Sequence, residues 1–210
     1  MPAIALTGAP PDLLALHELN RQRYPYLLQS LGGTGRWDIL FAFPQQHYPL
    51  YAEDSAEDFL SALDHLWCEA SAQVVADDSA THLPFRGGWF LFCAYELLQA
   101  IEPSVNVQSA GDGFPLACLS RIPAAVLVDR ENRQGWWVSE PGFEQCFSQL
   151  QNDLSRAVSF QAAPISAKNL IEEDAQQFLQ GVSRIKRYIR DGDVFQVNLA
   201  RRWEARLEQG

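Results

Sequence analysis

The chain has 210 residues, of which 47% are hydrophobic and 20% are charged, enough apolar material for a large domain or a domain with an appendage. Its formal net charge of -10 argues against nonspecific binding to nucleic acids, which needs a basic surface. No apolar run approaches the length of about 18 residues that spans a membrane, and the N-terminus lacks the basic region of a signal peptide. We therefore expect a cytoplasmic protein that binds neither nucleic acid nor membrane.

The first part of the chain mixes helical and extended patterns. Residues 10–20 are predicted to form a short helix, and residues 24–30 and 36–44 are predicted to be extended. Ser55 and Asp58 form a capping-box signal at the start of a longer helix. The apolar face of that helix is predicted to consist of Leu60, Leu63, Trp67, Ala70 and Val74.

The middle and the end of the chain continue in the same mixed manner. Residues 83–98 open on Gly87 and Gly88 and are predicted to run into a long buried strand, and residues 123–139 are predicted to form a hairpin. Two further helices follow from apolar residues at helical spacing, and the second is predicted to end at Gly192. Their apolar positions are Phe143, Phe147, Leu150, Leu154 and Val158 in the first, and Ala175, Phe178, Val182, Ile185 and Ile189 in the second.

Helices and strands do not alternate one for one, so the pattern favours an α+β fold over a doubly wound sheet. Residues 1–160 are predicted to form this α+β domain. Residues 161–170, small and polar with one proline, are predicted to be a linker. Residues 171–210 are predicted to begin a second domain.

The last apolar stretch is predicted to be a strand from the middle of a sheet. Phe195, Val197 and Leu199 would point to one face by the period of two. Gln196 and Asn198 would point to the other face, where each carboxamide must find a hydrogen-bond partner or cost about 1–3 kcal/mol. That polar face is either solvated or lines a substrate cavity, and the residues alone leave both possibilities open.

Candidate sites are few. Gly87 and Gly88 lack the surroundings of a glycine-rich phosphate loop, so we interpret them as a structural turn or bulge. Arg36 and Asp38 predict a local ion pair. The alternative is a zwitterion pocket, in which Ser30 and Arg36 hold a carboxylate and Trp37 supplies an apolar wall. The four cysteines lie 25 or more residues apart without metal-ligand spacing, and we find no catalytic constellation in the first domain.

Four motifs occur in an order and at a spacing that resemble a known family over nearly the whole chain. They are LLQS (27–30), RWDI (36–39), LPFRGGW (83–89) with YEL (95–97), and RDGDVFQVNLARRWEA (190–205). Together they resemble component I of the anthranilate synthase and aminodeoxychorismate synthase family. The last motif is the most specific, because its GD-x-[FY]-Q-V-N-L form resembles the aminodeoxychorismate branch.

The resemblance implies a layered fold of two intertwined parts, of which the second binds chorismate. It implies an enzyme that adds ammonia to chorismate at C4 and gives 4-amino-4-deoxychorismate for 4-aminobenzoate and folate synthesis. It also implies Mg²⁺ and a glutamine amidotransferase subunit that supplies the ammonia. The family's catalytic lysine segment, metal-binding glutamates and substrate loop are expected downstream, so this chain is expected to lack the catalytic half. Gln196 and Asn198 would then have a structural role inside the chorismate-binding part.

The resemblance further implies a site for L-tryptophan in the first domain. By position it would use Ser30 and the stretch Thr34, Gly35, Arg36 and Trp37. An aromatic residue often stands where this chain has Thr34, so one wall of the pocket would be missing. Alternatives are anthranilate synthase component I or another chorismate-utilising enzyme such as isochorismate synthase, a non-catalytic amino-acid-binding module, and a plain α+β interaction domain.

Overall fold

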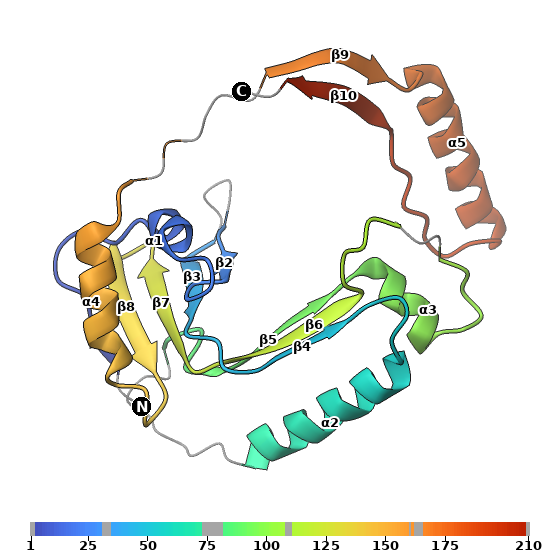
Figure 1. Cartoon of the computed structure of the whole chain (residues 1–210). Helices are drawn as coiled ribbons and strands as arrows, with labels where there is room; N and C mark the ends of the chain where they lie inside the picture. The colour runs from blue at the N-terminus through green and yellow to red at the C-terminus, as the bar shows by residue number, and fades with distance from the viewer. Residues whose placement is uncertain are drawn as a thin grey trace. The chain divides into compact units, whose positions relative to one another are not determined.

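The computed structural model describes residues 3–30, 35–72, 82–107, 111–159, 161 and 166–208. The chain divides into two compact units, residues 1–160 and 161–210 (Figure 1). Helices and strands are mixed in both units, and the strands of every sheet are antiparallel, which confirms the predicted α+β class.

The first sheet of unit 1–160 has five antiparallel strands in the order β1-β8-β7-β3-β2 (Figure 1). All six residues of the central strand β7 are buried, because α1 (Leu13–Leu19) and α4 (Cys146–Arg156) cover one face and an apolar cluster covers the other. The hairpin β7–β8 and the strand β3 confirm two predictions. The five strands are β1 (Ala3–Ala5), β2 (Tyr26–Leu28), β3 (Trp37–Ala42), β7 (Ala124–Asp129) and β8 (Gln134–Ser139).

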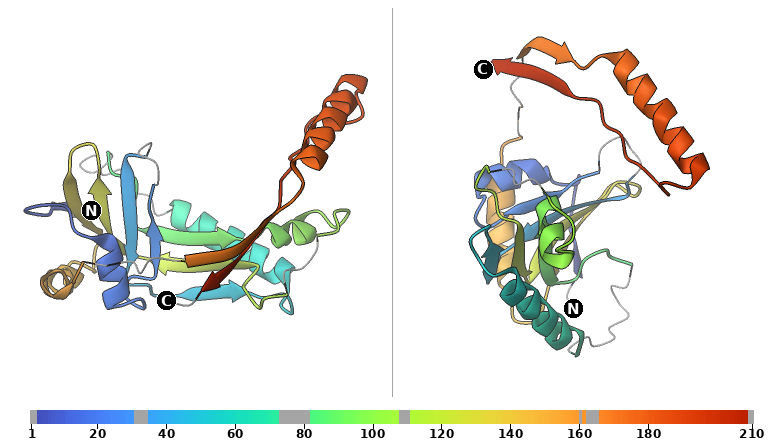
Figure 2. Two further views of the ribbon diagram at one scale, coloured as in Figure 1. Left: turned by 90° about the horizontal axis from the view of Figure 1, so that it is seen from above. Right: turned by 90° about the vertical axis from the view of Figure 1, so that its right-hand side faces the viewer.

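The second sheet of the same unit has three antiparallel strands in the order β4-β6-β5. They are β4 (His47–Leu50), β5 (Gly88–Cys93) and β6 (Ala117–Ile122). Helix α2 (Ala56–Ala72) lies along one face of this sheet (Figures 1 and 2). Only Pro123 separates β6 from β7, so the chain passes directly from the second sheet into the first.

Three clusters of buried apolar side chains form the core of unit 1–160. The largest lies between the first sheet and helices α1 and α4 and contains the fully buried Trp137. The second, with Leu50 and Phe59, joins the second sheet to α2. The third, with Leu83, covers the opposite face of the first sheet. Because each fully buried large apolar side chain contributes about 1.5–3 kcal/mol, these clusters supply the main stabilisation of the unit.

The helix signals are confirmed in part. The Ser55 hydroxyl accepts the backbone N–H of Asp58 at 3.2 Å, which is the predicted cap of α2. Leu60 and Leu63 pack against the second sheet, but Trp67 is 71% exposed, so it does not belong to the apolar face. Val74 lies outside the described residues, and Val158 of the next predicted helix is exposed beyond the end of α4.

The predicted long buried strand over 83–98 is wrong in length and in burial. Strand β5 ends at Cys93 and is followed by the helical turns η2 (Tyr95–Leu97) and α3 (Leu98–Ile101). Leu91 is 45% exposed. The reason is that β5 lies at the edge of a three-stranded sheet, so it is less covered than a central strand would be.

Unit 161–210 consists of β9 (Ser166–Glu172), α5 (Ala175–Asp191) and β10 (Trp203–Glu208), with β9 and β10 paired antiparallel (Figure 2). The predicted helix is confirmed, and Gly192 ends it in the left-handed conformation with φ of 82°. Part of the predicted linker 161–170 is wrong, because residues 166–170 belong to β9.

The predicted strand around Gln196 and Asn198 is wrong. Residues 194–202 form no strand, and Phe195 is 96% exposed. A strand needs a hydrogen-bonded neighbour. Within the described part of the unit, the closing segment finds one only for β10, which pairs with β9. Gln196 and Asn198 are exposed and contact each other, with Nε2 donating to Oδ1 at 3.5 Å.

Candidate functional site

The end of the β2–β3 hairpin brings together two residues of the predicted tryptophan site. Ser30 follows β2 and Gly35 precedes β3. A Cβ atom on Gly35 would overlap the Ser30 hydroxyl, so the position needs glycine for space rather than for an unusual φ. The Ser30 backbone N–H donates to Asp38 Oδ1 at 3.1 Å. Ser30 is therefore held on its backbone by Asp38 and lies against Gly35 with its side chain.

Arg36 is engaged by a buried carboxylate. Its Nη2 and Nε donate to Asp129 Oδ2 at 2.7 and 3.1 Å. Its guanidinium carbon lies 4.9 Å from the centroid of the Trp37 ring, a cation–π distance. A ligand carboxylate at Arg36 would consequently compete with Asp129 for the guanidinium. The sequence alone does not reveal this competition.

The Asp129 carboxyl is strongly stabilised as the anion. The hydrogen bond from Arg36 and further donors on Asn132 hold the pKa of Asp129 well below its usual range, against the opposing effect of burial. The same hydrogen bond raises the pKa of Arg36. Asp129 also accepts the backbone N–H groups of Glu131 and Asn132, so it organises the turn between β7 and β8.

Asp38 forms a second ion pair beside the first. Its Oδ2 accepts Nε–H of Arg130 at 2.8 Å, and the Asp38 side chain is 7% exposed. The prediction of a local ion pair between Arg36 and Asp38 is therefore wrong. Arg36 and Asp38 instead pair with residues at the end of β7, because the antiparallel register places Trp37 opposite Asp129.

The structure thus brings Ser30, Gly35, Arg36 and Trp37 to one end of the first sheet, while Thr34 lies outside the described residues. Asp129 and Arg130 belong to the same end and were missed as site residues, and Asp38, predicted only as a partner of Arg36, lies with them. No sequence signal could have found them as a group, because about ninety residues separate the β3 from the β7 members and pairing alone joins them. That these residues bind tryptophan stays a prediction.

The double glycine lies in a different environment. Gly87 and Gly88 have φ of 114° and 133°, which side chains rarely adopt. Arg121 Nη1 donates to the Gly88 carbonyl at 2.9 Å, and its Nη2 forms an ion pair with Glu140. A Cβ atom on Gly87 would overlap the Glu140 carboxylate. The segment therefore packs on an arginine–glutamate pair that joins the second sheet to the end of β8.

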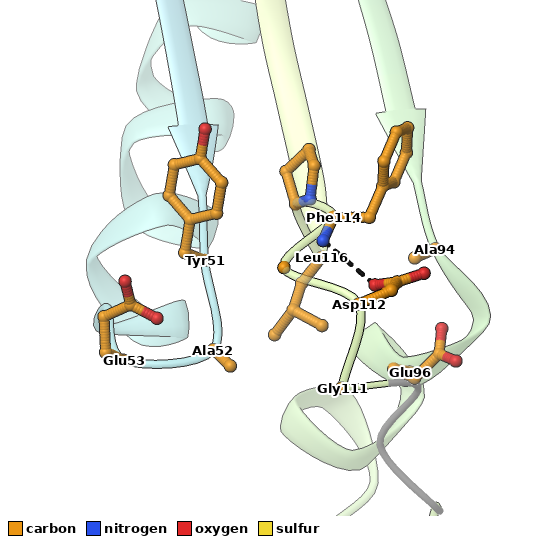
Figure 3. A pocket seen from close by; sticks show the side chains of 11 residues that line it. Tyr51, Ala52, Glu53, Ala94, Glu96, Gly111, Asp112, Phe114 and Leu116 are labelled. Carbon is orange, nitrogen blue, oxygen red and sulfur yellow. Dashed lines mark hydrogen bonds between the residues drawn. The ribbon is translucent and has the colours of Figure 1, made fainter.

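A cavity of about 380 Å³ lies at one end of the second sheet (Figure 3). Three separate segments line it, and its carboxylates come from Glu53, Glu96 and Asp112, with Tyr51 and Phe114 as aromatic walls. Asp112 Oδ1 accepts the backbone N–H of Phe114 at 2.9 Å. The carboxylates disfavour an anionic ligand there. Sequence reasoning missed this cavity because its residues share no motif.

A buried polar group links the two sheets. Ser120 Oγ lies 2.7 Å from Tyr26 Oη and 2.7 Å from His47 Nδ1, and the Tyr26 ring stacks on Phe90 with centroids 4.0 Å apart. Ser120 is almost completely buried, so its hydroxyl is not accessible to a substrate. The group connects strand β2 of the first sheet to strands β4, β5 and β6 of the second.

The described residues provide no group of three or more His, Cys, Asp or Glu side chains that could hold a metal ion. The Mg²⁺ implied by the resemblance stays a prediction. Among the described helices, none has the length and apolarity to cross a membrane.

Comparison with known proteins defines the class. A family model described as chorismate binding enzyme matches residues 24–209. The chain belongs to this family of chorismate-utilising enzymes. An "Anthranilate synthase component I-like protein" of Synechocystis sp. (strain ATCC 27184 / PCC 6803 / Kazusa) is 29% identical over 156 residues, which cover 73% of this chain and 32% of that protein.

A solved structure shows a further similarity. Anthranilate synthase component I from Streptococcus pneumoniae TIGR4 aligns with a TM-score of 0.48 and 16% identity, over 80% of this chain and 41% of that chain. The chain spans about a third of the length of the curated relative that it matches.

Proposed function

We propose that this chain is part of an enzyme that aminates chorismate at C4 and yields 4-amino-4-deoxychorismate for 4-aminobenzoate and folate synthesis. Membership of the chorismate-binding family supports a chorismate-utilising enzyme. The observation that carries the choice of branch is the sequence GDVFQVNL at residues 192–199, which lies within the matched range and resembles the aminodeoxychorismate form.

We propose that the residues that bind chorismate and Mg²⁺ lie outside these 210 residues, as the resemblance implies. The chain covers 32% of its curated relative, and its described residues provide no candidate metal cluster. We propose that chorismate and Mg²⁺ bind to residues that correspond to the part of the relative that this chain does not match. A glutamine amidotransferase subunit is the proposed source of ammonia.

The proposal also includes an L-tryptophan site at the end of the β2–β3 hairpin. The Ser30 backbone N–H donates to Asp38 there, the Ser30 side chain lies against Gly35, and the Arg36 guanidinium lies over the Trp37 ring. An aromatic zwitterion would find apolar surface at Trp37 and hydrogen-bond donors at Ser30 and Arg36, which is the donor set that a carboxylate needs.

A product assay tests the reaction. The protein expressed from its complete gene would be incubated with chorismate, Mg²⁺ and either ammonium or glutamine with the amidotransferase, and products would be separated by chromatography and identified by mass. We expect 4-amino-4-deoxychorismate, formed from chorismate and ammonia with loss of water and without release of pyruvate. Reactions without Mg²⁺, and reactions with glutamine but no amidotransferase, serve as controls and should give no product.

The alternatives give different results in the same assay. Anthranilate together with an equal amount of pyruvate would reassign the protein to anthranilate synthase component I. If chorismate were unchanged and calorimetry showed L-tryptophan binding, a non-catalytic amino-acid-binding module would replace the proposed enzyme.

A further inference from the structure

Asp38 connects two parts of the chain that are far apart in sequence. Its Oδ1 accepts the backbone N–H of Ser30, and its Oδ2 accepts Nε–H of Arg130. The carboxylate is buried, and a buried carboxylate is costly unless it is paired and hydrogen-bonded. Arg130 therefore orients the Asp38 carboxylate, and Asp38 in turn fixes the backbone of Ser30.

The side chain of Ser30 depends on that backbone position. Its hydroxyl occupies the space that a Cβ atom of Gly35 would need, so a small shift of the Ser30 backbone changes where the hydroxyl lies. Arg36, the other polar group of the hairpin end, is held separately by Asp129. The two ion pairs adjoin each other, because the Arg130 backbone N–H also donates to the Arg36 carbonyl at 2.8 Å.

We propose that Arg130 and Asp38 are positioning residues for the amino-acid site at this hairpin end, acting through the Ser30 backbone. The inference rests on the tryptophan site proposed above and identifies two residues that set its affinity. Neither residue needs to touch the ligand. Without Arg130 the buried carboxylate loses its cationic partner, and Ser30 loses the fixed acceptor that orients it.

The test compares variants by calorimetric titration with L-tryptophan, and records the melting temperature of each. Arg130→Met and Asp38→Ala should weaken tryptophan binding by about tenfold or more. Arg130→Lys keeps a cation beside Asp38 and should restore most of the affinity. Arg130 is only partly buried, so its variants are expected to fold even if Asp38→Ala does not.

Asp153→Ala is the matched control. Asp153 is an equally buried carboxylate that pairs with Arg23 at 2.6 Å and accepts the Tyr24 hydroxyl at 2.8 Å. The loss of the Asp153 carboxylate should lower the melting temperature and leave the affinity for tryptophan unchanged. The reason is that Asp153 belongs to helix α4 and not to the hairpin end.

The outcomes separate the two proposals. If the wild-type protein binds L-tryptophan and Arg130→Met binds it equally well, the positioning role is overturned and the tryptophan site stands. A parallel loss of affinity and melting temperature in every variant, Asp153→Ala included, also overturns it, because that result indicates general destabilisation. If the wild-type protein gives no heat with millimolar L-tryptophan, the tryptophan site itself is refuted and the positioning role falls with it.

Discussion

Three buried aspartates hold segments of unit 1–160 together. Asp38, Asp129 and Asp153 are each nearly inaccessible to solvent, and each pairs with an arginine that is partly exposed. Removing one partner from such a pair is more costly than the pair is favourable, because the remaining charge loses its compensation. Ion pairs of this kind therefore specify which segments meet more than they add to stability.

The lowered pKa of Asp129 should make the free energy of unfolding decrease in acid. Its folded-state pKa lies below its usual range, so its contribution is present above the unfolded-state pKa of about 3.9 and is lost as the pH falls through the folded-state value. Urea unfolding midpoints of the wild type and of Asp129→Asn should therefore differ by a constant amount above about pH 5 and converge as the pH falls from about 4 to about 2. A difference that stays constant over this range would contradict the prediction.

The double glycine offers a second residue-level prediction. Gly87→Ala and Gly88→Ala should both destabilise the protein by about 1–3 kcal/mol, because both positions have φ in the left-handed region. Gly87→Ala should cost more, since only its Cβ atom meets the Glu140 carboxylate, whereas nothing lies within 4 Å of a Cβ atom on Gly88. Chemical denaturation of both variants measures the difference, and equal losses would show that the Arg121–Glu140 pair tolerates the added methyl group.

At the scale of elements, local signals decide where helices begin and neighbours decide where strands form. The start of α2 and the C-terminal glycine of α5 follow from side chains and backbone within one turn. Strand β7 is recognisable because its run of buried apolar residues is continuous. The closing stretch also has apolar residues at strand spacing, yet residues 194–202 form no strand, since pairing is not a local property.

The cap of α2 can be tested by itself. Ser55→Ala removes the acceptor for the Asp58 N–H and should lower stability by about 0.5–2 kcal/mol. Ser61→Ala, at an exposed position inside the same helix, is the control and should be neutral or slightly stabilising, because alanine favours helix interiors. Thermal or denaturant unfolding distinguishes them, and equal effects would mean that the cap contributes nothing.

At the scale of the molecule, the buried core lies in unit 1–160. All three core clusters belong to it, whereas no described residue of unit 161–210 is buried. In the second unit, Leu199 makes a contact with α5 near Gly181, but large apolar side chains such as Phe195 and Trp203 remain exposed. A unit with so little buried surface contributes little stability of its own.

A shortened chain tests this distribution. Residues 1–160 expressed alone should keep the cooperative thermal transition of the 210-residue chain, with a midpoint within a few degrees, because the core clusters are retained. Circular dichroism of both chains measures the midpoints. A large drop, or loss of cooperativity, would show that residues 161–210 stabilise the first unit.

Much of the fold could be predicted from the sequence because periodicity and capping are local. The helices α1, α2, α4 and α5 and the hairpin β7–β8 follow from such signals. The candidate site could be predicted only in part. Ser30, Gly35, Arg36, Trp37 and Asp38 are close in sequence, but the partners Asp129 and Arg130 were not found, because the register between β3 and β7 decides those pairs.

The sequence by itself determined the chemistry-bearing motifs, the mixed α+β class and the resemblance to chorismate-utilising enzymes, because these depend on residue identity and short-range order. Only the tertiary structure decided that Arg36 binds Asp129 and that Arg130 holds Asp38, and only it showed that the stretch around Gln196 and Asn198 is exposed rather than paired. The physical reason is that ion pairing and strand pairing join residues through space, and their partners are selected by sheet register and burial.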